Sequence, residues 1–144
     1  MKRMFVMVSA AALTIVLTSQ TKKPAAAASK GGALAASITR GKEVYLQQCL
    51  ACHQADGLGV QNMNPPLVKT KYVLGDKTTL VQVVLKGMQG VDIDDESYHN
   101  VMAPHPDLTD QQIADVLTYI RKSFGNKASA VTAAEVKAIR AKTK

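Results

Sequence analysis

The two cysteines of this 144-residue chain stand three positions apart and are followed at once by a histidine. Cys49, Cys52 and His53 form a C-x-x-C-H motif, and the chain has no other cysteine. Residues three and four apart lie on one face of a helical turn, so a helix here would present both thiols and the imidazole to the same side. Any fold of this chain therefore has to accommodate a face that carries two thiols and an imidazole.

Three kinds of site use such a motif. A redox disulfide needs only the C-x-x-C pair and is typical of βαβ folds. A structural zinc site needs four Cys or His ligands, and the other two histidines, His99 and His105, lie far downstream. C-x-x-C-H is the signature of c-type haem attachment, in which both thiols bond to one edge of the haem. We therefore predict one covalent haem c on Cys49 and Cys52, with His53 as the proximal iron ligand.

The N-terminus has the layout of an export signal. Lys2 and Arg3 precede an uncharged apolar run at residues 4–17. The run is short for a bilayer span, which needs about 20 apolar residues. Small residues suited to cleavage follow, but Lys22 and Lys23 stand before them, so cleavage and retention as an anchor both remain open. We expect an exported, periplasmic protein that is soluble or tethered to the cytoplasmic membrane.

Differences in composition divide the rest of the chain into a linker and a domain. Residues 29–37 are rich in Ala, Ser and Gly without hydrophobic periodicity, and we predict a linker there. Residues 38–144 then form the haem-binding domain, and residues 1–28 the signal peptide or anchor. The formal charge is +7, but without residues 1–28 the chain has 14 basic and 11 acidic residues. So small an excess does not suggest a nucleic-acid partner.

Helical patterns predict an all-α fold in which long loops wrap around the haem. The Thr109 and Thr132 capping boxes mark the start of two helices, and we find no convincing alternating strand. Loops as long as those at 54–77 and 87–108 are uncommon in a small domain unless they serve a function. The expected helices lie at residues 40–49, 78–86, 110–124 and 133–142.

Residues 39–126 resemble the class I cytochromes c in their small bacterial form. The segments that carry the resemblance are Gly41-Lys42-x-Val44-Tyr45-x-x-x-Cys49, Cys52-His53-Gln54-Ala55-Asp56-Gly57-x-Gly59, Asn64-Pro65-Pro66-Leu67 and Ile113-Ala114-Asp115-Val116-Leu117-Thr118-Tyr119-Ile120-Arg121. The resemblance implies that the Pro65 carbonyl accepts a hydrogen bond from His53 and that Leu67 packs on the haem. It also implies that Tyr119 meets Gly41 where the first and third helices cross.

The sixth iron ligand has several candidates, because methionine and histidine both bind haem iron. The segment from Tyr98 to Pro104 resembles the family's Y-N-x-x-M-P pattern, in which the methionine binds iron, although Ala103 replaces the usual proline. The resemblance therefore implies Met102 as the distal ligand. The other candidates are Met63, Met88, His99 and His105.

A haem with both axial positions filled suits electron transfer, and no general acid or base is placed for catalysis. We expect a non-enzymatic one-electron carrier of a periplasmic respiratory chain, with a dehydrogenase as donor and an oxidase or reductase as acceptor. The alternative is a haem c subunit of a membrane-bound dehydrogenase or terminal oxidase. An open-site haem enzyme or gas sensor would require Met102 to be off the iron.

Overall fold

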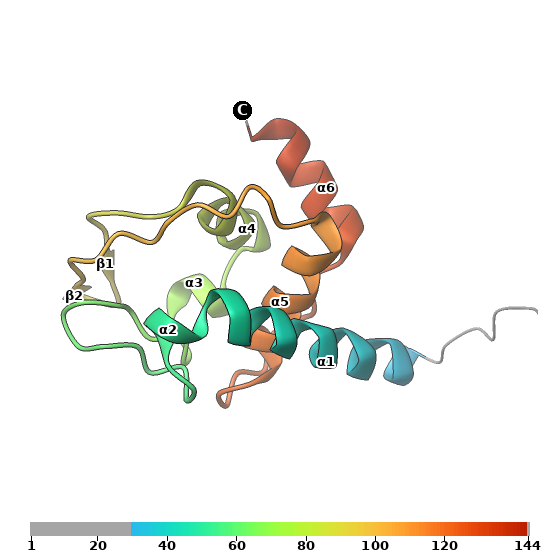
Figure 1. The fold of residues 1–144 in the computed structure, drawn as a ribbon, viewed down its shortest axis with the longest axis horizontal. Coiled ribbons are helices and arrows are strands. Elements are labelled where there is room, and N and C mark those ends of the chain that lie inside the picture. Colours follow the sequence, from blue (N-terminus) through green and yellow to red (C-terminus); the bar gives the residue numbers. More distant parts are fainter. Residues whose placement is uncertain (1–29, 144) are drawn as a thin grey trace, which may run out of the picture.

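The computed structural model describes residues 30–143, which form four longer helices, two single-turn helices and one small hairpin (Figure 1). The predicted signal or anchor at 1–28 lies outside the described residues. No helix within the described part has the length and apolarity needed to cross a bilayer. The elements are α1 Lys30–Gln48, α2 Leu50–His53, α3 Lys71–Leu74, α4 Lys77–Lys86, β1 Asp92–Ile93, β2 Glu96–Ser97, α5 Asp110–Lys122 and α6 Ala133–Lys142.

The crossing of α1 and α5 forms the base of the fold. A Cβ built on Gly41 would collide with the backbone carbonyl of Asp115 and lie 2.8 Å from Cβ of Tyr119. Only glycine lets the two backbones approach this closely, which confirms the predicted meeting of Gly41 and Tyr119. Tyr45 packs beside them, with its ring centroid 5.4 Å from that of Tyr119 and 5.5 Å from that of Phe124.

The first helix begins at Lys30 rather than near residue 40. Residues 30–37 are therefore helical, and the expected start of the first helix near residue 40 was wrong. Alanine is the strongest helix former, and a polar anchor holds the added turns: Ser37 Oγ donates to Asp115 over 2.6 Å, and Arg40 pairs with the same carboxylate at 2.7 Å. Division of the chain into a linker and a haem domain stays a prediction.

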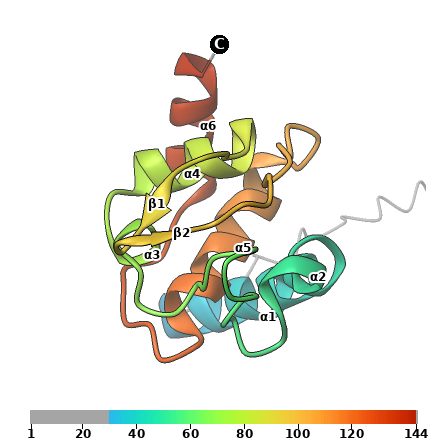
Figure 2. The same cartoon turned by 90° about the vertical axis from the view of Figure 1, so that its left-hand side faces the viewer.

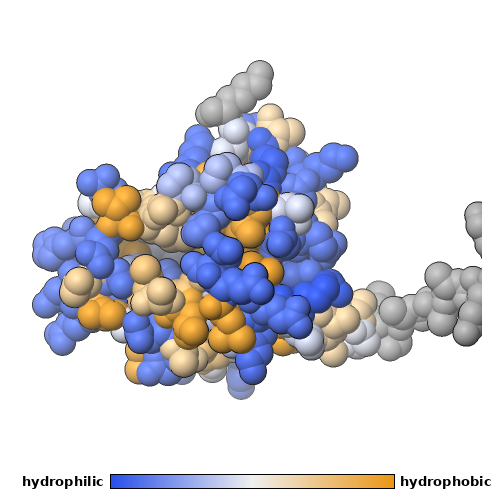
Figure 3. Space-filling view, viewed as in Figure 1, coloured by the Kyte–Doolittle hydropathy of each residue, from blue (hydrophilic) through white to orange (hydrophobic). Residues whose placement is uncertain are grey.

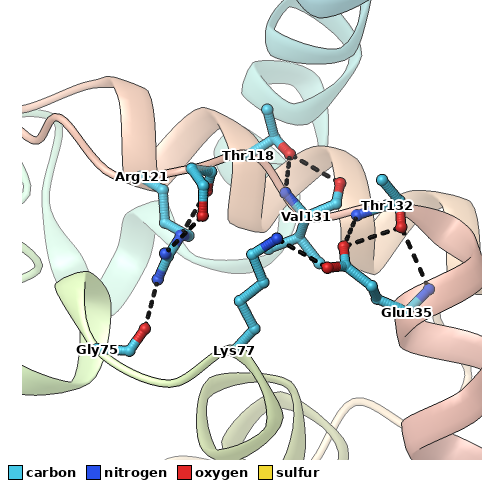
Figure 4. A network of polar contacts seen from close by, with 8 residues as sticks. Gly75, Lys77, Thr118, Arg121, Val131, Thr132 and Glu135 are labelled. Carbon is cyan, nitrogen blue, oxygen red and sulfur yellow. Dashed lines mark hydrogen bonds and ion pairs between the residues drawn. The ribbon is translucent and has the colours of Figure 1, made fainter.

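A second layer consists of α4, α5 and α6, with α6 standing against the other two (Figures 1 and 2). The capping boxes predicted at Thr109 and Thr132 are both present. Helix α6 buries Val136 completely, and Lys77 on α4 forms an ion pair with Glu135 at 2.8 Å (Figure 4).

The connection between α5 and α6 is fixed by buried polar contacts. Thr118 donates its hydroxyl to the Val131 carbonyl over 3.0 Å and accepts from the Val131 amide (Figure 4). Arg121, also buried, donates to the carbonyls of Gly75 and Ser129. These bonds attach the α5–α6 connection and the turn before α4 to the centre of the fold.

The hairpin of β1 and β2 was not expected, because two residues per strand are too few to show an alternating pattern. Asp94 and Asp95 form its turn with φ values of 53° and 67°, a conformation that aspartate tolerates better than most residues. Except for these two short strands, the described part of the chain consists of helices joined by long loops, as predicted for an all-α fold.

Candidate haem-binding site

The C-x-x-C-H motif forms a helical turn, as its spacing predicts. The amide of Cys49 donates to the Tyr45 carbonyl at the end of α1, and the amide of His53 donates to the Cys49 carbonyl, both over 2.9 Å. Cys49 is half-buried, whereas Cys52 is exposed. Burial, with a smaller contribution from the neighbouring Cys52, raises the pKa of the Cys49 thiol to about 11.

His53 is buried and oriented by a backbone carbonyl. Its Nδ1 lies 3.0 Å from the carbonyl oxygen of Pro65, and a carbonyl can only accept, so Nδ1 carries the proton. The lone pair of Nε2 is then available to a metal. Burial lowers the pKa of His53, against the partial opposition of the Pro65 hydrogen bond. The neutral imidazole that results is the form that ligates metals.

His53 and Cys49 line a cavity of about 730 Å³, a volume that includes its open mouth. Helices α4 and α5 provide much of the remaining wall. The lining side chains are mainly apolar and comprise Cys49, His53, Pro65, Pro66, Leu67, Thr70, Tyr72, Val73, Leu80, Val83, Val84, Met88, Ile93, Met102, His105, Leu108, Val116, Leu117 and Ile120.

A second hollow adjoins this cavity and shares Cys49, His53, Pro65, Met102 and His105 with it. It adds more polar or exposed residues, among them Cys52, Asn64, Asn100 and Val101. Hydrophobic side chains lie on either side of a hollow at the left of the molecule (Figure 3). The site therefore has an apolar interior and an edge open to solvent.

These residues fit a c-type haem. The macrocycle needs a large apolar space, two thiols at one edge and a neutral imidazole beside it. The cavity supplies the space, Cys49 and His53 line both the cavity and the outer hollow, and Cys52 lines the outer hollow. Leu67, predicted to pack on the haem, is part of the wall. The residues that hold the haem nevertheless remain a prediction.

Three of the candidate sixth ligands line the cavity: Met88, Met102 and His105. Met102 and His105 also line the outer hollow. Met63 lines neither hollow and is 48% exposed, and His99 is likewise exposed. The structure thus brings Met102 to the cavity of His53, together with two neighbours of similar chemistry.

Met102 is fixed by backbone bonds on both sides. It exchanges two hydrogen bonds with Met88, of 3.0 and 2.9 Å, in an isolated antiparallel bridge. Three residues later, the amide of His105 donates to the Val84 carbonyl over 2.9 Å. The segment that carries Met102 is therefore bound to α4 and to the residues that follow it.

Sequence reasoning missed Asn64. Its side chain donates to the Cys52 carbonyl over 3.1 Å and accepts from the Asn100 amide over 2.8 Å, and only 9% of the residue is exposed. Asparagine in a loop beside proline predicts a turn, so no local signal marks this role. The apolar stripe of α5 was recognised, but not that Val116 and Ile120 face a cavity.

Most of this chain is similar in sequence to known proteins. Residues 38–124 match the family model described as "Cytochrome c". The cytochrome c-552 of Thermus thermophilus is 35% identical over 121 residues, which cover 77% of this chain and 81% of that protein. The cytochrome c subunit of the quinone alcohol dehydrogenase of Gluconobacter oxydans is 38% identical over 69% of this chain.

The CcoP subunit of the cbb3-type cytochrome c oxidase of Azospirillum brasilense is 34% identical over 65% of this chain. The lengths differ greatly, since the chain spans only 22% of the Gluconobacter subunit and 30% of CcoP. The family match extends over more than half of the chain and contains the whole C-x-x-C-H segment. The chain belongs to the cytochrome c family, whose cofactor is covalently bound haem c.

Proposed function

We propose that this protein is a monohaem cytochrome c that carries single electrons between redox proteins. Cys49 and Cys52 attach the haem, His53 is its proximal ligand, and Met102 is its distal ligand. When bound, the haem supplies one-electron chemistry between Fe(III) and Fe(II). The observation that carries the proposal is that His53 and Met102 line one apolar cavity, with both thiols at its open edge.

The side chains around the site favour a carrier over an enzyme. The titratable residues that line the two hollows are Cys49, Cys52, His53, Tyr72 and His105, with no carboxylate among them. Apolar walls exclude water and favour the less charged, reduced state of a bound group. The exposed residues at the mouth leave one edge accessible to a partner. The protein therefore needs to hold and expose its cofactor, not to position a substrate.

The visible spectrum of the holoprotein tests the ligand set. We expect a methionine-to-iron charge-transfer band in the ferric protein and little carbon monoxide binding in the ferrous protein. Met102→Ala removes the band and admits carbon monoxide, whereas Met63→Ala, at an exposed methionine, leaves both unchanged. Loss of the band in Met88→Ala with Met102→Ala unaffected, or a wild-type ferric protein that lacks the band, would contradict the assignment.

Export is the second part of the proposal, and the charged and apolar layout of residues 1–20 supports it. We propose a periplasmic protein, soluble or held to the cytoplasmic membrane by its N-terminus. N-terminal sequencing of the native protein checks this. A start at residue 28 or 29 indicates cleavage, an intact start with membrane association indicates an anchor, and a cytoplasmic holoprotein contradicts export.

A second candidate function is a subunit that stays within a larger redox complex. The similarity to the cytochrome c subunits of dehydrogenases and to an oxidase subunit favours it. Purification from native membranes under mild detergent separates the two. A carrier, whether soluble or tethered, is recovered without other chains, whereas a subunit stays in a fixed ratio to a dehydrogenase or oxidase.

A further inference from the structure

Arg140 on α6 reaches across to the segment that follows Met102. Its Nε donates to the Asp110 carboxylate over 2.7 Å. Its two terminal nitrogens donate to the backbone carbonyls of Pro106, over 3.0 Å, and Leu108, over 2.5 Å. One guanidinium thus joins the start of α5 to two carbonyls of the preceding loop, with the planar geometry that favours arginine over lysine.

The loop that Arg140 contacts is joined to Met102 by a short stretch of chain with a restricted backbone. Pro106 is four residues after Met102, and prolines at 104 and 106 restrict the backbone between them. The amide of His105 is bonded to α4 in the same stretch. Leu108 is buried and lines the cavity. A shift of the two anchored carbonyls would therefore move both the Met102 segment and the cavity wall.

The anchor comes from a part of the chain beyond the family match. That match ends at residue 124, whereas α6 spans Ala133–Lys142. The Arg140 side chain is only 30% exposed and Asp110 29% exposed, so solvent screens the contact only in part. A second contact of α6, the Lys77–Glu135 ion pair, joins α6 to α4 and does not involve the loop. The Arg140 contacts and the Lys77–Glu135 ion pair can therefore be removed by separate substitutions.

We propose that Arg140 is a positioning residue that keeps Met102 in the cavity, so that α6 controls how readily the sixth ligand is displaced. This inference rests on the proposed role of Met102 as the distal ligand. Without the Arg140 contacts we expect displacement of Met102 to become about tenfold easier, which corresponds to about 1.4 kcal/mol.

Imidazole binding to the ferric holoprotein measures this displacement, because imidazole takes the sixth position only when methionine leaves. We expect Arg140→Gln to raise the imidazole affinity about tenfold. Arg140→Lys keeps the charge and should raise this affinity less. Lys77→Gln loosens α6 without touching the loop, and Lys137→Gln removes an exposed charge from the same helix. Both are expected to bind imidazole as the wild type does.

Hydrogen exchange provides a second readout that needs no ligand. The His105 amide bond to Val84 reports on the loop, and we expect its exchange to quicken in Arg140→Gln but not in Lys77→Gln. If Arg140→Gln and Lys77→Gln had the same imidazole affinity and the same exchange rate at the His105 amide, the inference would be overturned while Met102 remained the ligand. A wild-type protein without the methionine band would overturn the ligand assignment, and the role of Arg140 with it.

Discussion

The side-chain amide of Asn100 donates to the side-chain oxygen of Asn64 over 2.8 Å, and so joins two segments at the open edge of the cavity. Asn64 immediately precedes Pro65, whose carbonyl orients His53, and Asn100 stands two residues before Met102. The pair therefore connects the loop on the His53 side of the site to the segment on the Met102 side.

Replacing Asn100 with alanine leaves the oxygen of the buried Asn64 without this donor. An unsatisfied buried acceptor costs about 1–3 kcal/mol, so we expect Asn100→Ala to lower the free energy of unfolding of the holoprotein by about 1 kcal/mol. Urea denaturation measures it. Gln61→Ala, at an exposed position of the neighbouring loop, is the control, and an equal loss in both variants would contradict this account.

Gly59 leaves room for the carbonyl that orients His53. A Cβ on Gly59 would collide with the Asn64 backbone oxygen and lie 2.6 Å from the Pro65 oxygen, and its φ is +65°. We expect Gly59→Ala to displace that oxygen, weaken the hydrogen bond to His53 and raise the reduction potential, because the bond makes the imidazole a stronger donor to iron.

A redox titration of the holoprotein measures this change. Gly90→Ala is a matched control, since Gly90 has a φ of +63° but nothing within 4 Å of its Cβ position. It shares the backbone strain without the collision, so its potential should stay at the wild-type value. A similar rise in both variants would contradict the role given to the Pro65 carbonyl.

Gly41 tests the α1–α5 crossing. Because a side chain there meets the Asp115 backbone and Tyr119, we expect Gly41→Ala to destabilise the protein by roughly 2 kcal/mol or more, in the range of overpacked cores. Gly31 lies in the same helix with nothing within 4 Å, and alanine favours helices over glycine by about 1 kcal/mol. Gly31→Ala should therefore be neutral or stabilising in thermal unfolding, and a loss as large as that of Gly41→Ala would refute the close approach.

The Asp115 carboxylate makes the free energy of unfolding depend on pH in the acidic range. Burial would raise its pKa, but hydrogen bonds from Arg40, Ser37 and Gln111 outweigh burial and lower it. The ionised carboxylate therefore stabilises the fold above its unfolded pKa of about 3.9. This stability is lost as the pH falls from there through the lowered folded value.

We expect Asp115→Asn to be less stable than the wild type at neutral pH by about 1 kcal/mol, a modest value because Arg40 is 51% exposed. It should also lose less stability on acidification from about pH 5 to pH 2. Urea denaturation across this range measures both. Asp107→Asn, at an exposed carboxylate, should follow the wild-type curve, and parallel curves for all three proteins would contradict the role of Asp115.

Features fixed by short segments were predictable from the sequence. The helical turn of Cys49 and His53 and the caps at Thr109 and Thr132 depend on residues at most four positions apart. The contacts of His53 with Pro65 and of Gly41 with Tyr119 are longer in range, and the resemblance to a known family implied them.

Other features depend on partners that no local pattern identifies. The Asn64–Asn100 bond spans 36 positions and the Arg140–Asp110 contact spans 30. Residues 30–37 have a composition that suits a linker or a helix equally, and the contact of Ser37 with Asp115 is formed only in the folded chain. Apolar periodicity likewise shows which face of α5 is buried, but not that this face lines a cavity.

The intact mass of the native protein tests whether one haem is covalently bound at Cys49 and Cys52. We predict a mass that exceeds that of the processed polypeptide by one haem and survives denaturation. The double variant Cys49→Ser, Cys52→Ser should lose this excess. A native mass equal to the polypeptide alone, or lower by the two hydrogens of a disulfide, would contradict the account.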